Sequence, residues 1–364
     1  MSSEVDSGVV GDEKAKGGTR SPEPAFLAAC RRKPTSHTPI WLMRQAGRYL
    51  PEYRKIRRKV DFLTLTKTPE LAAEVTLQPL SRFELDAAIL FSDIMTPVEG
   101  MGIELEFKPG PLIADPVRTP ADVDRVRPAD PEESVPFVFE TIRILRKELP
   151  ESTPLIGFAG APWTLFCYLV EGKGSKTFIK AKSFLFAEPE AARVLLNKLS
   201  DGMAAYLRAQ AEAGAQALMI FDSWAGLLSP YEFRSFALTA VRRILENLRD
   251  LDLPLIYFPN QGATLLEDAA RAGADVLGID WRLPLSRARA IVGPELPVQG
   301  NLDPAALFAP RRALETQIRS VLREAGPGPG HIFNLGHGIE PATDPGAVAF
   351  LVDKVHEWTE RTAG

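Results

Sequence analysis

The stretch ALMIFDSWAGLLSPYEFRSFALTAVRRILENLRDLDLPLIYFPN, residues 217–260, contains the pattern that decides the fold. Two short apolar runs, Ala217–Phe221 and Leu255–Phe258, flank a long amphipathic segment that begins at Pro230. Ser229 precedes that segment as a candidate helix N-cap. Short buried strands joined by helices are typical of a parallel sheet, so the stretch predicts one strand–helix–strand unit.

The same alternation recurs along most of the chain. The runs that we expect to form strands are Ile40–Met43, Ala87–Phe91, Leu155–Phe158, Ala217–Phe221, Leu255–Phe258, Val276–Ile279, Pro297–Gln299 and Ile332–Asn334. The helices expected between them include Pro69–Phe83 after the candidate cap Thr68, Glu188–Glu212, Pro230–Leu251, and Pro304–Arg323 after Asp303. Eight strand candidates in 364 residues predict an α/β fold, a (β/α)8 TIM barrel in one domain spanning residues 22–364.

Two further features bear on the fold. No G-x-G-x-x-G follows a strand and opens a helix, which argues against an open dinucleotide-binding sheet. Residues 99–130 interrupt the alternation, and we expect an insertion there, with a hairpin that turns at Pro109–Gly110.

Composition excludes several classes of protein. Lys and Arg total 43 against 47 Asp and Glu, and 45% of the residues are hydrophobic, which is ordinary for a globular chain. This balance gives no reason to expect nucleic acid as a partner, and no apolar run is long enough to span a membrane. Residues 1–21 are polar, carry both signs of charge and resemble no targeting signal, so we expect a disordered tail. Cys30 and Cys167 indicate idle thiols in a reducing cytoplasm.

The positions just after the expected strands are the informative ones, because a parallel barrel carries its chemistry at the carboxyl ends of its strands. A polar residue follows every expected strand. These residues include Arg44, Gln45, Arg48, Ser92, Asp93, Tyr168, Asp222, Ser223, Asn260, Asp280, Asn301 and His337. Loops are polar in general, so the residue types carry more information than the polarity alone.

Arg44 and Arg48 directly follow the first expected strand and flank Gly47. A guanidinium group offers a planar fork of donors that fits a carboxylate or a phosphate. A glycine lets the backbone approach a ligand closely. The block therefore predicts a polyanionic ligand. The basic residues that follow are better interpreted as a solvated helix face, namely Arg54, Lys55, Arg58 and Lys59.

Asp93 has two interpretations that the sequence leaves open. It either caps a loop or pairs with an arginine, or it accepts N–H groups and balances a cationic intermediate. For Asp280 we favour the structural interpretation. His337 lies between two glycines and either fixes its own turn or binds a carboxylate. Tyr168 and Ser223 are hydrogen-bonding groups without an adjacent base in the sequence.

The histidines are His37, His331, His337 and His356, and they form neither an H-E-x-x-H motif nor a closely spaced cluster. We therefore expect a barrel enzyme that binds a small polyanionic molecule without a metal or another cofactor.

The segments that carry these residues resemble the uroporphyrinogen decarboxylase family. They are IWLMRQAGRYLPEYRKIR at 40–57, GFAGAPWTLFCYLVEG at 157–172, FDSWAGLLSP, IDWR, QGNLDP and FNLGHGIEP. The similarity extends from about Phe26 to about Trp358. It implies a cytoplasmic homodimer of single-domain barrels that decarboxylates the four acetate side chains of uroporphyrinogen III, giving coproporphyrinogen III in haem biosynthesis. It also implies that this reaction needs no metal and no organic cofactor.

The resemblance assigns roles position by position. It implies that Arg44 and Arg48 hold substrate carboxylates, that Gln45, Ala46 and Gly47 form the binding loop between them, and that Arg57 is a further arginine of the site. It implies that Asp93 accepts hydrogen bonds from the pyrrole N–H groups and is the catalytic residue. It implies that Tyr168, Ser223 and His337 contact the macrocycle.

Three questions stay open at this stage. The acid that supplies the proton is an arginine, Asp93 or water. Methyltransferases that share the barrel activate a thiol with zinc, and they need His and Cys ligands near the last strands, where this chain has no cysteine. A tetrapyrrole-binding protein without catalysis is the other alternative.

Overall fold

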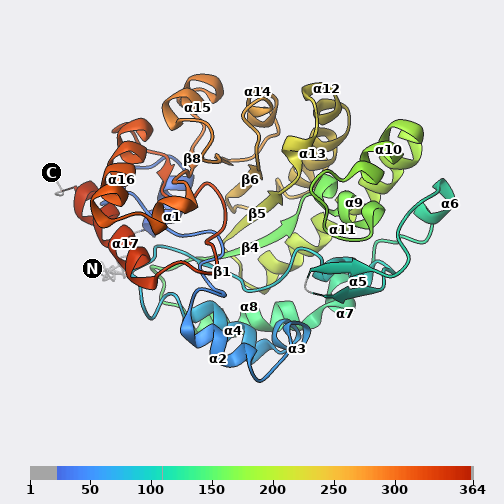
Figure 1. The fold of residues 1–364 in the computed structure, drawn as a ribbon, viewed down its shortest axis with the longest axis horizontal. Helices are drawn as coiled ribbons and strands as arrows, with labels where there is room; N and C mark the ends of the chain where they lie inside the picture. The colour runs from blue at the N-terminus through green and yellow to red at the C-terminus, as the bar shows by residue number, and fades with distance from the viewer. Residues whose placement is uncertain (1–22, 109, 362–364) are drawn as a thin grey trace, which may run out of the picture.

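The computed structural model describes residues 23–108 and 110–361, and within them seven short parallel strands form a curled sheet surrounded by helices (Figure 1). The expected tail, residues 1–21, lies outside the described residues. Order in the sheet is β1-β4-β5-β6-β7-β8-β9. The strands are β1 (Ala88–Ile89), β4 (Leu155–Gly160), β5 (Ala217–Asp222), β6 (Leu255–Pro259), β7 (Val276–Gly278), β8 (Val298–Gln299) and β9 (His331–Ile332).

Burial on both faces explains why the strands are continuous apolar runs. Every residue of β4 and β6 is buried, and neighbouring strands pair in parallel register, for example Ile220 with Tyr257. A parallel sheet covered by helices on its outer face requires this pattern. The alternation seen in the sequence therefore located seven of the eight expected strands.

The eighth expected strand, Ile40–Met43, is wrong as a strand. It makes a single parallel bridge, Ile40 to Phe333, and the Ile40 carbonyl accepts a hydrogen bond from the Asp86 N–H at 2.9 Å. The Trp41 N–H donates to the Phe333 carbonyl at 3.3 Å, whereas the Leu42 and Met43 N–H groups donate to the side chains of Gln45 and Asn334. The segment thus lies between β9 and β1 without forming a ladder. The described residues form a curled seven-stranded sheet, not the closed eight-stranded barrel that we expected.

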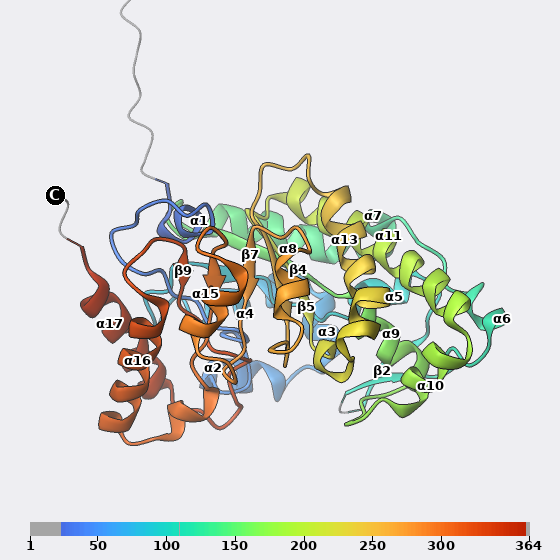
Figure 2. The ribbon, with the colours of Figure 1, turned by 90° about the horizontal axis from the view of Figure 1, so that it is seen from above.

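Helices pack around the sheet on its outer side (Figures 1 and 2). Before β5 they are α1 (Ala25–Cys30), α2 (Pro51–Arg57), α3 (Phe62–Lys67), α4 (Pro69–Leu77), α5 (Thr96–Gly100), α6 (Pro120–Val123), α7 (Pro131–Ser134), α8 (Pro136–Glu148), α9 (Pro162–Glu171), α10 (Ile179–Ala187) and α11 (Pro189–Ala213). After β5 they are α12 (Pro230–Glu232), α13 (Leu238–Asn247), α14 (Leu266–Ala270), α15 (Leu285–Val292), α16 (Arg311–Ala325) and α17 (Pro345–Thr359). Shorter turns are the 3-10 helices η1 (Ala225–Leu227) and η3 (Pro304–Phe308) and the π-turn η2 (Phe233–Ala237).

The predicted helix signals are partly confirmed. Ser229 forms a reciprocal capping box with Glu232 at the start of α12, as its position suggested. Thr68 precedes α4 but does not cap it, because its hydroxyl donates to the Thr64 carbonyl at 2.7 Å. The helix expected over residues 304–323 is split: Asp303 caps only η3, and α16 begins after Pro310.

The insertion forms the expected hairpin. Strands β2 (Leu105–Phe107) and β3 (Pro111–Ile113) pair antiparallel, and the Lys108 N–H donates to the Gly110 carbonyl at 2.9 Å. Pro109, which we expected in the turn, lies outside the described residues.

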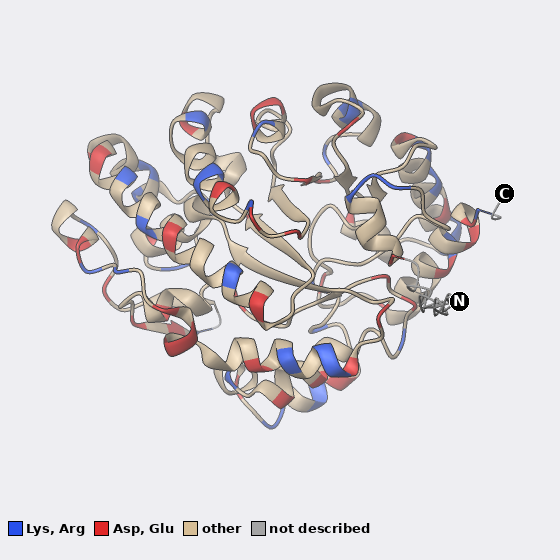
Figure 3. Cartoon of the chain, turned by 180° about the vertical axis from the view of Figure 1, so that it is seen from behind, with Lys and Arg blue, Asp and Glu red and all other residues tan. Residues whose placement is uncertain are grey.

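The first and last described segments lie side by side at one end of the molecule (Figure 2). The Thr38 N–H donates to the Thr359 hydroxyl at 2.9 Å, and the Arg361 N–H donates to the Ser36 carbonyl at 2.7 Å. Basic and acidic residues alternate over the outer helices, so neither sign dominates this surface (Figure 3). Within the described residues, no helix has the length and apolar character to cross a membrane.

Candidate active site

The loop after Ile40–Met43 turns sharply at Arg44. Arg44 adopts a left-handed backbone conformation with φ of 62°, and the Gln45 N–H closes the turn on the Leu42 carbonyl at 2.8 Å. The Gln45 side chain is fully buried. It accepts from the Leu42 N–H at 2.9 Å and donates to the Ala87 carbonyl at 3.0 Å. Gln45 therefore fastens the loop to the start of β1, and its side chain does not face the neighbouring site residues.

Arg44 lies across Gly338, in the loop after β9. A Cβ atom at Gly338 would lie 2.4 Å from the Arg44 Cδ, which is closer than real Cβ contacts come. Gly338 thus provides the flat surface on which the arginine rests. The sequence predicted a role for His337 in this loop but gave no signal for its glycine neighbour.

Arg44 is the centre of a group of charged and polar side chains that we call the Arg44 cluster: Arg44, Arg48, Asp93, Tyr168 and His337. Burial lowers the pKa of Arg44, and the nearby Arg48 lowers it further, while Tyr168, Asp93 and Glu340 oppose the shift. Arg48 thus lies close enough to Arg44 for the two positive charges to repel, and a bound anion would relieve that repulsion.

Asp93 is half-buried at the end of the segment that follows β1. Its Oδ1 accepts the Met95 N–H at 2.9 Å, which is the local turn expected from the structural interpretation. Burial raises the pKa of Asp93, and the Met95 N–H and the Arg44 charge oppose that rise. One oxygen thus holds the loop, while the charge of the carboxylate is felt by Arg44. The turn and the nearby arginine both belong to the structural interpretation, and a role of Asp93 toward a substrate stays a prediction.

Aromatic rings surround the remaining members of the cluster. Tyr168, on α9, packs edge-on against Phe178 and Trp224, with ring centroids 5.6 and 6.2 Å apart. His337 faces Trp281 at 6.3 Å. Burial lowers the pKa of His337 to about 4, and the charges of Arg44 and Arg282 add to the shift. His337 is therefore uncharged at neutral pH.

Arg48 and Arg57 both carry a positive charge near Tyr53. Burial raises the pKa of Tyr53, and both arginines oppose that rise. Arg57 ends α2 and donates to the Val60 carbonyl, so part of its donor capacity is already used. The Tyr53 ring packs against Phe91, two residues before Asp93.

The basic helix face after this loop is exposed, as predicted, at Arg54, Lys55, Arg58 and Lys59. Arg54 has a local structural role in addition. It donates to the carbonyls of Arg48 and Tyr49 at 3.0 and 2.9 Å and so supports the loop that carries Arg48.

Ser223 and the loop atoms of Ala46 and Gly47 complete the residues predicted for the site. Ser223 is half-buried after β5, and its carbonyl accepts from the Asn260 side chain at 3.0 Å. Ala46 and Gly47 are half-buried, and their N–H groups have no hydrogen-bond partner within residues 23–108 and 110–361. These donors are available to a ligand.

The sequence placed Asp222 after an expected strand without assigning it a role. The structure shows that this carboxylate is the centre of a hydrogen-bond network. Asp222 ends β5 in full burial and accepts hydrogen bonds from the Thr164 hydroxyl at 2.8 Å and the Tyr257 hydroxyl at 3.0 Å. Burial raises its pKa to about 6, and the two hydroxyl groups oppose the rise. The backbone N–H of Trp224 donates to the same Thr164 oxygen at 3.2 Å. This bond connects the network to the aromatic rings that pack against Tyr168.

Other polar residues at strand ends connect neighbouring loops. Asn301 donates to the Asp280 carbonyl at 2.9 Å, and Asn334 accepts the Met43 N–H at 2.9 Å. Asp280 accepts the Arg282 N–H at 2.8 Å and its guanidinium at 3.3 Å, which agrees with the structural interpretation that we favoured.

The two cysteines do not approach each other. Cys30 is buried on α1 and Cys167 is buried on α9. Within the described residues, the side chains close enough to share a metal ion are His37, Asp86 and His356, at the amino ends of the strands and without a cysteine. The zinc–thiolate site of the methyltransferase alternative is therefore not formed by these residues.

Comparisons with known proteins agree with this arrangement. The family model for uroporphyrinogen decarboxylase matches residues 21–358. A uroporphyrinogen decarboxylase of Geobacter metallireducens is 52% identical over 336 residues, covering 92% of this chain and 99% of that one. One of Syntrophotalea carbinolica is 53% identical over 335 residues, covering 92% and 98%. Among solved structures, a methyltransferase from Methanosarcina mazei has a TM-score of 0.78 over 92% of this chain and 98% of that one, at 22% identity, which shows a shared fold alone. The chain belongs to the uroporphyrinogen decarboxylase family.

Proposed function

We propose that this protein is a uroporphyrinogen decarboxylase, a carboxy-lyase of haem biosynthesis. It converts the four acetate side chains of uroporphyrinogen III to methyl groups and releases coproporphyrinogen III. The observation that carries the proposal is Arg44 lying across Gly338, within the electrostatic influence of Asp93, Tyr168 and Arg48. Family membership at about half identity supports the same activity.

In this proposal the arginines of the site bind the substrate carboxylates. Arg44 and Arg48 supply charge-assisted hydrogen bonds, and Arg57 adds a third positive charge at the periphery. The free N–H groups of Ala46 and Gly47 donate to a carboxylate, while Gln45 holds the loop from behind. Tyr168, Ser223 and the uncharged His337 contact the macrocycle and its side chains.

The substrate itself provides the electron sink. A proton added to a pyrrole ring carbon makes the ring cationic, and the bond to the carboxylate then breaks with its electron pair moving into the ring. Carbon dioxide leaves, a second proton reaches the exocyclic carbon, and the first proton departs from the ring. Each cycle therefore consumes one proton and turns an acetate into a methyl group. Because the protonated ring accepts the electron pair, this scheme does not require a metal or an organic cofactor as the electron acceptor.

Asp93 is the catalytic residue in this scheme. Its carboxylate accepts hydrogen bonds from pyrrole N–H groups and stabilises the cationic ring. Met95 holds one carboxylate oxygen in place, so the charge is preorganised before the substrate binds. The proton comes from an arginine, from Asp93 or from water.

We also propose the wider organisation that the family resemblance implies. Residues 22–364 form one barrel domain, with the segment around Ile40 in the eighth position between β9 and β1; its bridge to Phe333 supports this closure. The enzyme works in the cytoplasm, and residues 1–21 are a dispensable tail.

The protein acts as a homodimer in this proposal. Large apolar side chains are exposed on α10, where Ile179 is 63% and Phe186 is 59% accessible, and Tyr231 on α12 is 71% accessible. The two helices are adjacent, because Lys182 lies 3.5 Å from Glu232. Exposed aromatic and aliphatic groups gathered in one place are typical of interfaces. The patch lies beside Tyr168, whose neighbour Phe178 directly precedes α10.

The decisive experiment is turnover by protein treated with a strong chelator. Uroporphyrinogen III, prepared by reduction and kept without oxygen, is incubated with the protein, and the products are oxidised and separated by carboxyl number. We expect all intermediates down to four carboxyl groups, at the same rate before and after the chelator. Stoichiometric binding without products would favour a tetrapyrrole-binding protein. Activity restored only by zinc, in protein whose unfolding temperature the chelator leaves unchanged, would favour the methyltransferase-like alternative.

A further inference from the structure

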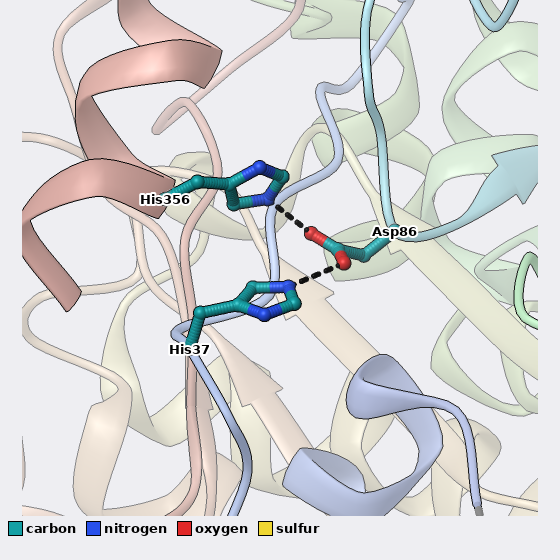
Figure 4. Close-up of side chains that lie close together, drawn as sticks. All are labelled: His37, Asp86 and His356. Atoms are coloured by element: carbon teal, nitrogen blue, oxygen red, sulfur yellow. Dashed lines mark hydrogen bonds and ion pairs between the residues drawn. The ribbon is translucent and has the colours of Figure 1, made fainter. Parts of the chain in front are cut away.

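A second group of titratable side chains lies at the opposite end of the sheet from the Arg44 cluster. His37 precedes the Ile40 bridge, Asp86 precedes β1, and His356 is on α17 (Figure 4). His37 Nε2 lies 2.7 Å from Asp86 Oδ1, and His356 Nε2 lies 2.8 Å from Asp86 Oδ2. The two imidazole rings are in contact, with centroids 4.5 Å apart. One carboxylate therefore faces two imidazole nitrogens.

The other ring nitrogen of His37 has its own partner. Its Nδ1 lies 3.0 Å from the Ser36 hydroxyl, so Nδ1–H can donate to that oxygen once a bound cation replaces the proton between Nε2 and Asp86. Histidines that bind metals characteristically use the second nitrogen in this way, which fixes the tautomer and the ring orientation. Asp86 is also held in place, because its Oδ2 accepts the Ile40 N–H at 2.7 Å.

The surroundings favour a cation. The three side chains line an open pocket of about 510 Å³ that also contains Glu84, Glu357 and Glu360. Side-chain accessibilities of 24%, 13% and 22% for His37, Asp86 and His356 leave the group reachable from the pocket.

We propose that His37, Asp86 and His356 form a binding site for one divalent transition-metal ion of the zinc type. Two imidazole nitrogens and one carboxylate are a ligand set that zinc, cobalt and nickel accept, whereas magnesium and calcium prefer oxygen alone. In a tetrahedral zinc site, ligand atoms about 2 Å from the ion are about 3.3 Å from one another. One ligand atom from each of the three side chains lies within 4.8 Å of the other two, so small side-chain rotations would bring all three into contact with one ion.

The fourth position faces the pocket, where water completes the coordination. The three ligands come from the first described segment, from the start of β1 and from the last helix. An ion bound there would connect the first described segment and α17 to the sheet beside the Ile40 bridge. Its role is stabilisation of the fold, separate from the chemistry at the Arg44 cluster.

The probe is Zn²⁺ added to chelator-treated, full-length protein, followed by calorimetric titration and thermal unfolding. We expect one ion per chain and a rise in the unfolding temperature when zinc binds. Co²⁺ used in place of Zn²⁺ should give the intense visible bands of four-coordinate cobalt without a thiolate charge-transfer band. These measurements are independent of decarboxylase activity, so their failure and the failure of the proposed function are distinguishable.

Three variants test the ligands. His37→Asn and His356→Asn should each weaken zinc binding by at least about tenfold, since second-sphere losses alone cost 10- to 100-fold. Glu357→Gln is the matched control, because Glu357 lines the same pocket but is already paired with Lys354. It should bind zinc as tightly as the unmodified protein.

Three outcomes would overturn the proposal: no zinc binding by the unmodified protein, unchanged binding in His356→Asn, or sulfur in the coordination sphere. X-ray absorption of the zinc-loaded, unmodified protein measures that sphere directly, so the proposal stays testable if a variant fails to fold. A sphere of nitrogen and oxygen with two imidazoles would support it.

Discussion

Asp93 holds a local turn and is also the proposed catalytic residue, and the variant Asp93→Asn tests these two roles separately. An asparagine keeps the oxygen that accepts the Met95 N–H, so the free energy of unfolding should stay close to that of the unmodified protein. It loses the charge. Removing one preorganised electrostatic group typically costs about 100- to 1000-fold in rate. We expect turnover of uroporphyrinogen III to fall at least about 100-fold, with coproporphyrinogen still bound through Arg44 and Arg48.

The control for this variant is Asp130→Asn. Asp130 accepts the Glu132 N–H at 2.9 Å in the same type of local turn, at the start of α7 and outside the Arg44 cluster. It should keep normal turnover. A near-normal rate for Asp93→Asn would return Asp93 to a purely structural role.

Gly338 tests whether the position of Arg44 matters. An alanine Cβ at residue 338 would overlap the Arg44 side chain, and the flexible arginine would have to move. We expect Gly338→Ala to fold normally but to lose about tenfold or more in kcat/KM, mainly through a higher KM, because Arg44 binds the substrate in our proposal. Gly328→Ala is the control, since a Cβ there would meet no atom within 4 Å. Unchanged kinetics for both variants would show that Arg44 does not need this surface.

The sequence predicted single residues well where their type was unusual for their place. Two arginines after an apolar run and a histidine between glycines indicated Arg44, Arg48 and His337 as candidates; the structure places Arg48 and His337 near Arg44, and their role in binding stays a prediction. It could not tell that Gln45 points inward, because an amide suits both a ligand and a backbone. It could not find the His37–Asp86–His356 group either, because these residues are far apart in the chain and only folding brings them together.

At the scale of elements, the Asp222 network connects α9 to β5 and β6. Thr164→Val would remove the hydroxyl that donates to Asp222 and accepts the Trp224 N–H. A buried carboxylate that loses a donor costs about 1–3 kcal/mol. We expect that loss in the free energy of unfolding measured with urea at pH 7, where Asp222 is ionised because its pKa is about 6.

Thr141→Val is the matched control for this element. Thr141 is also a buried helical threonine, but its hydroxyl donates only to the Phe137 carbonyl of its own helix at 2.8 Å. That carbonyl remains available to the helix, so the cost should be smaller than for Thr164→Val. Equal costs would mean that Asp222 does not depend on its hydroxyl donor.

Hydrophobic runs predicted the elements where backbone pairing followed them, and failed where side chains replaced that pairing. The run Ile40–Met43 is as apolar as the true strands, yet three of its N–H groups bond to the side chains of Asp86, Gln45 and Asn334. These partners are distant or point in directions that the sequence does not reveal. The strand count was therefore one too high, and the segment contacts the edge of the sheet through its isolated bridge to Phe333.

For the whole molecule, the parallel arrangement separates two groups of polar residues along the strands. Residues that follow the strands gather into the Arg44 cluster, and residues that precede them, such as Asp86, face the pocket between the two ends of the chain. Because all seven strands run in one direction, each face receives groups from distant parts of the sequence. Substitutions can therefore test the Arg44 cluster and the His37–Asp86–His356 group separately.

The last prediction concerns assembly. If the patch on α10 and α12 is the dimer interface, Ile179→Asp combined with Phe186→Asp should place two charges where apolar groups meet. Burying an unpaired charge is costly, so we expect the unmodified protein to sediment at twice its chain mass of 39.9 kDa and the double variant to sediment as a monomer. Phe308→Asp is the control, because Phe308 is 53% accessible on η3 and outside the patch, and it should remain a dimer. A double variant that still sediments as a dimer would place the interface on another surface, and loss of the dimer in Phe308→Asp alone would place it at η3.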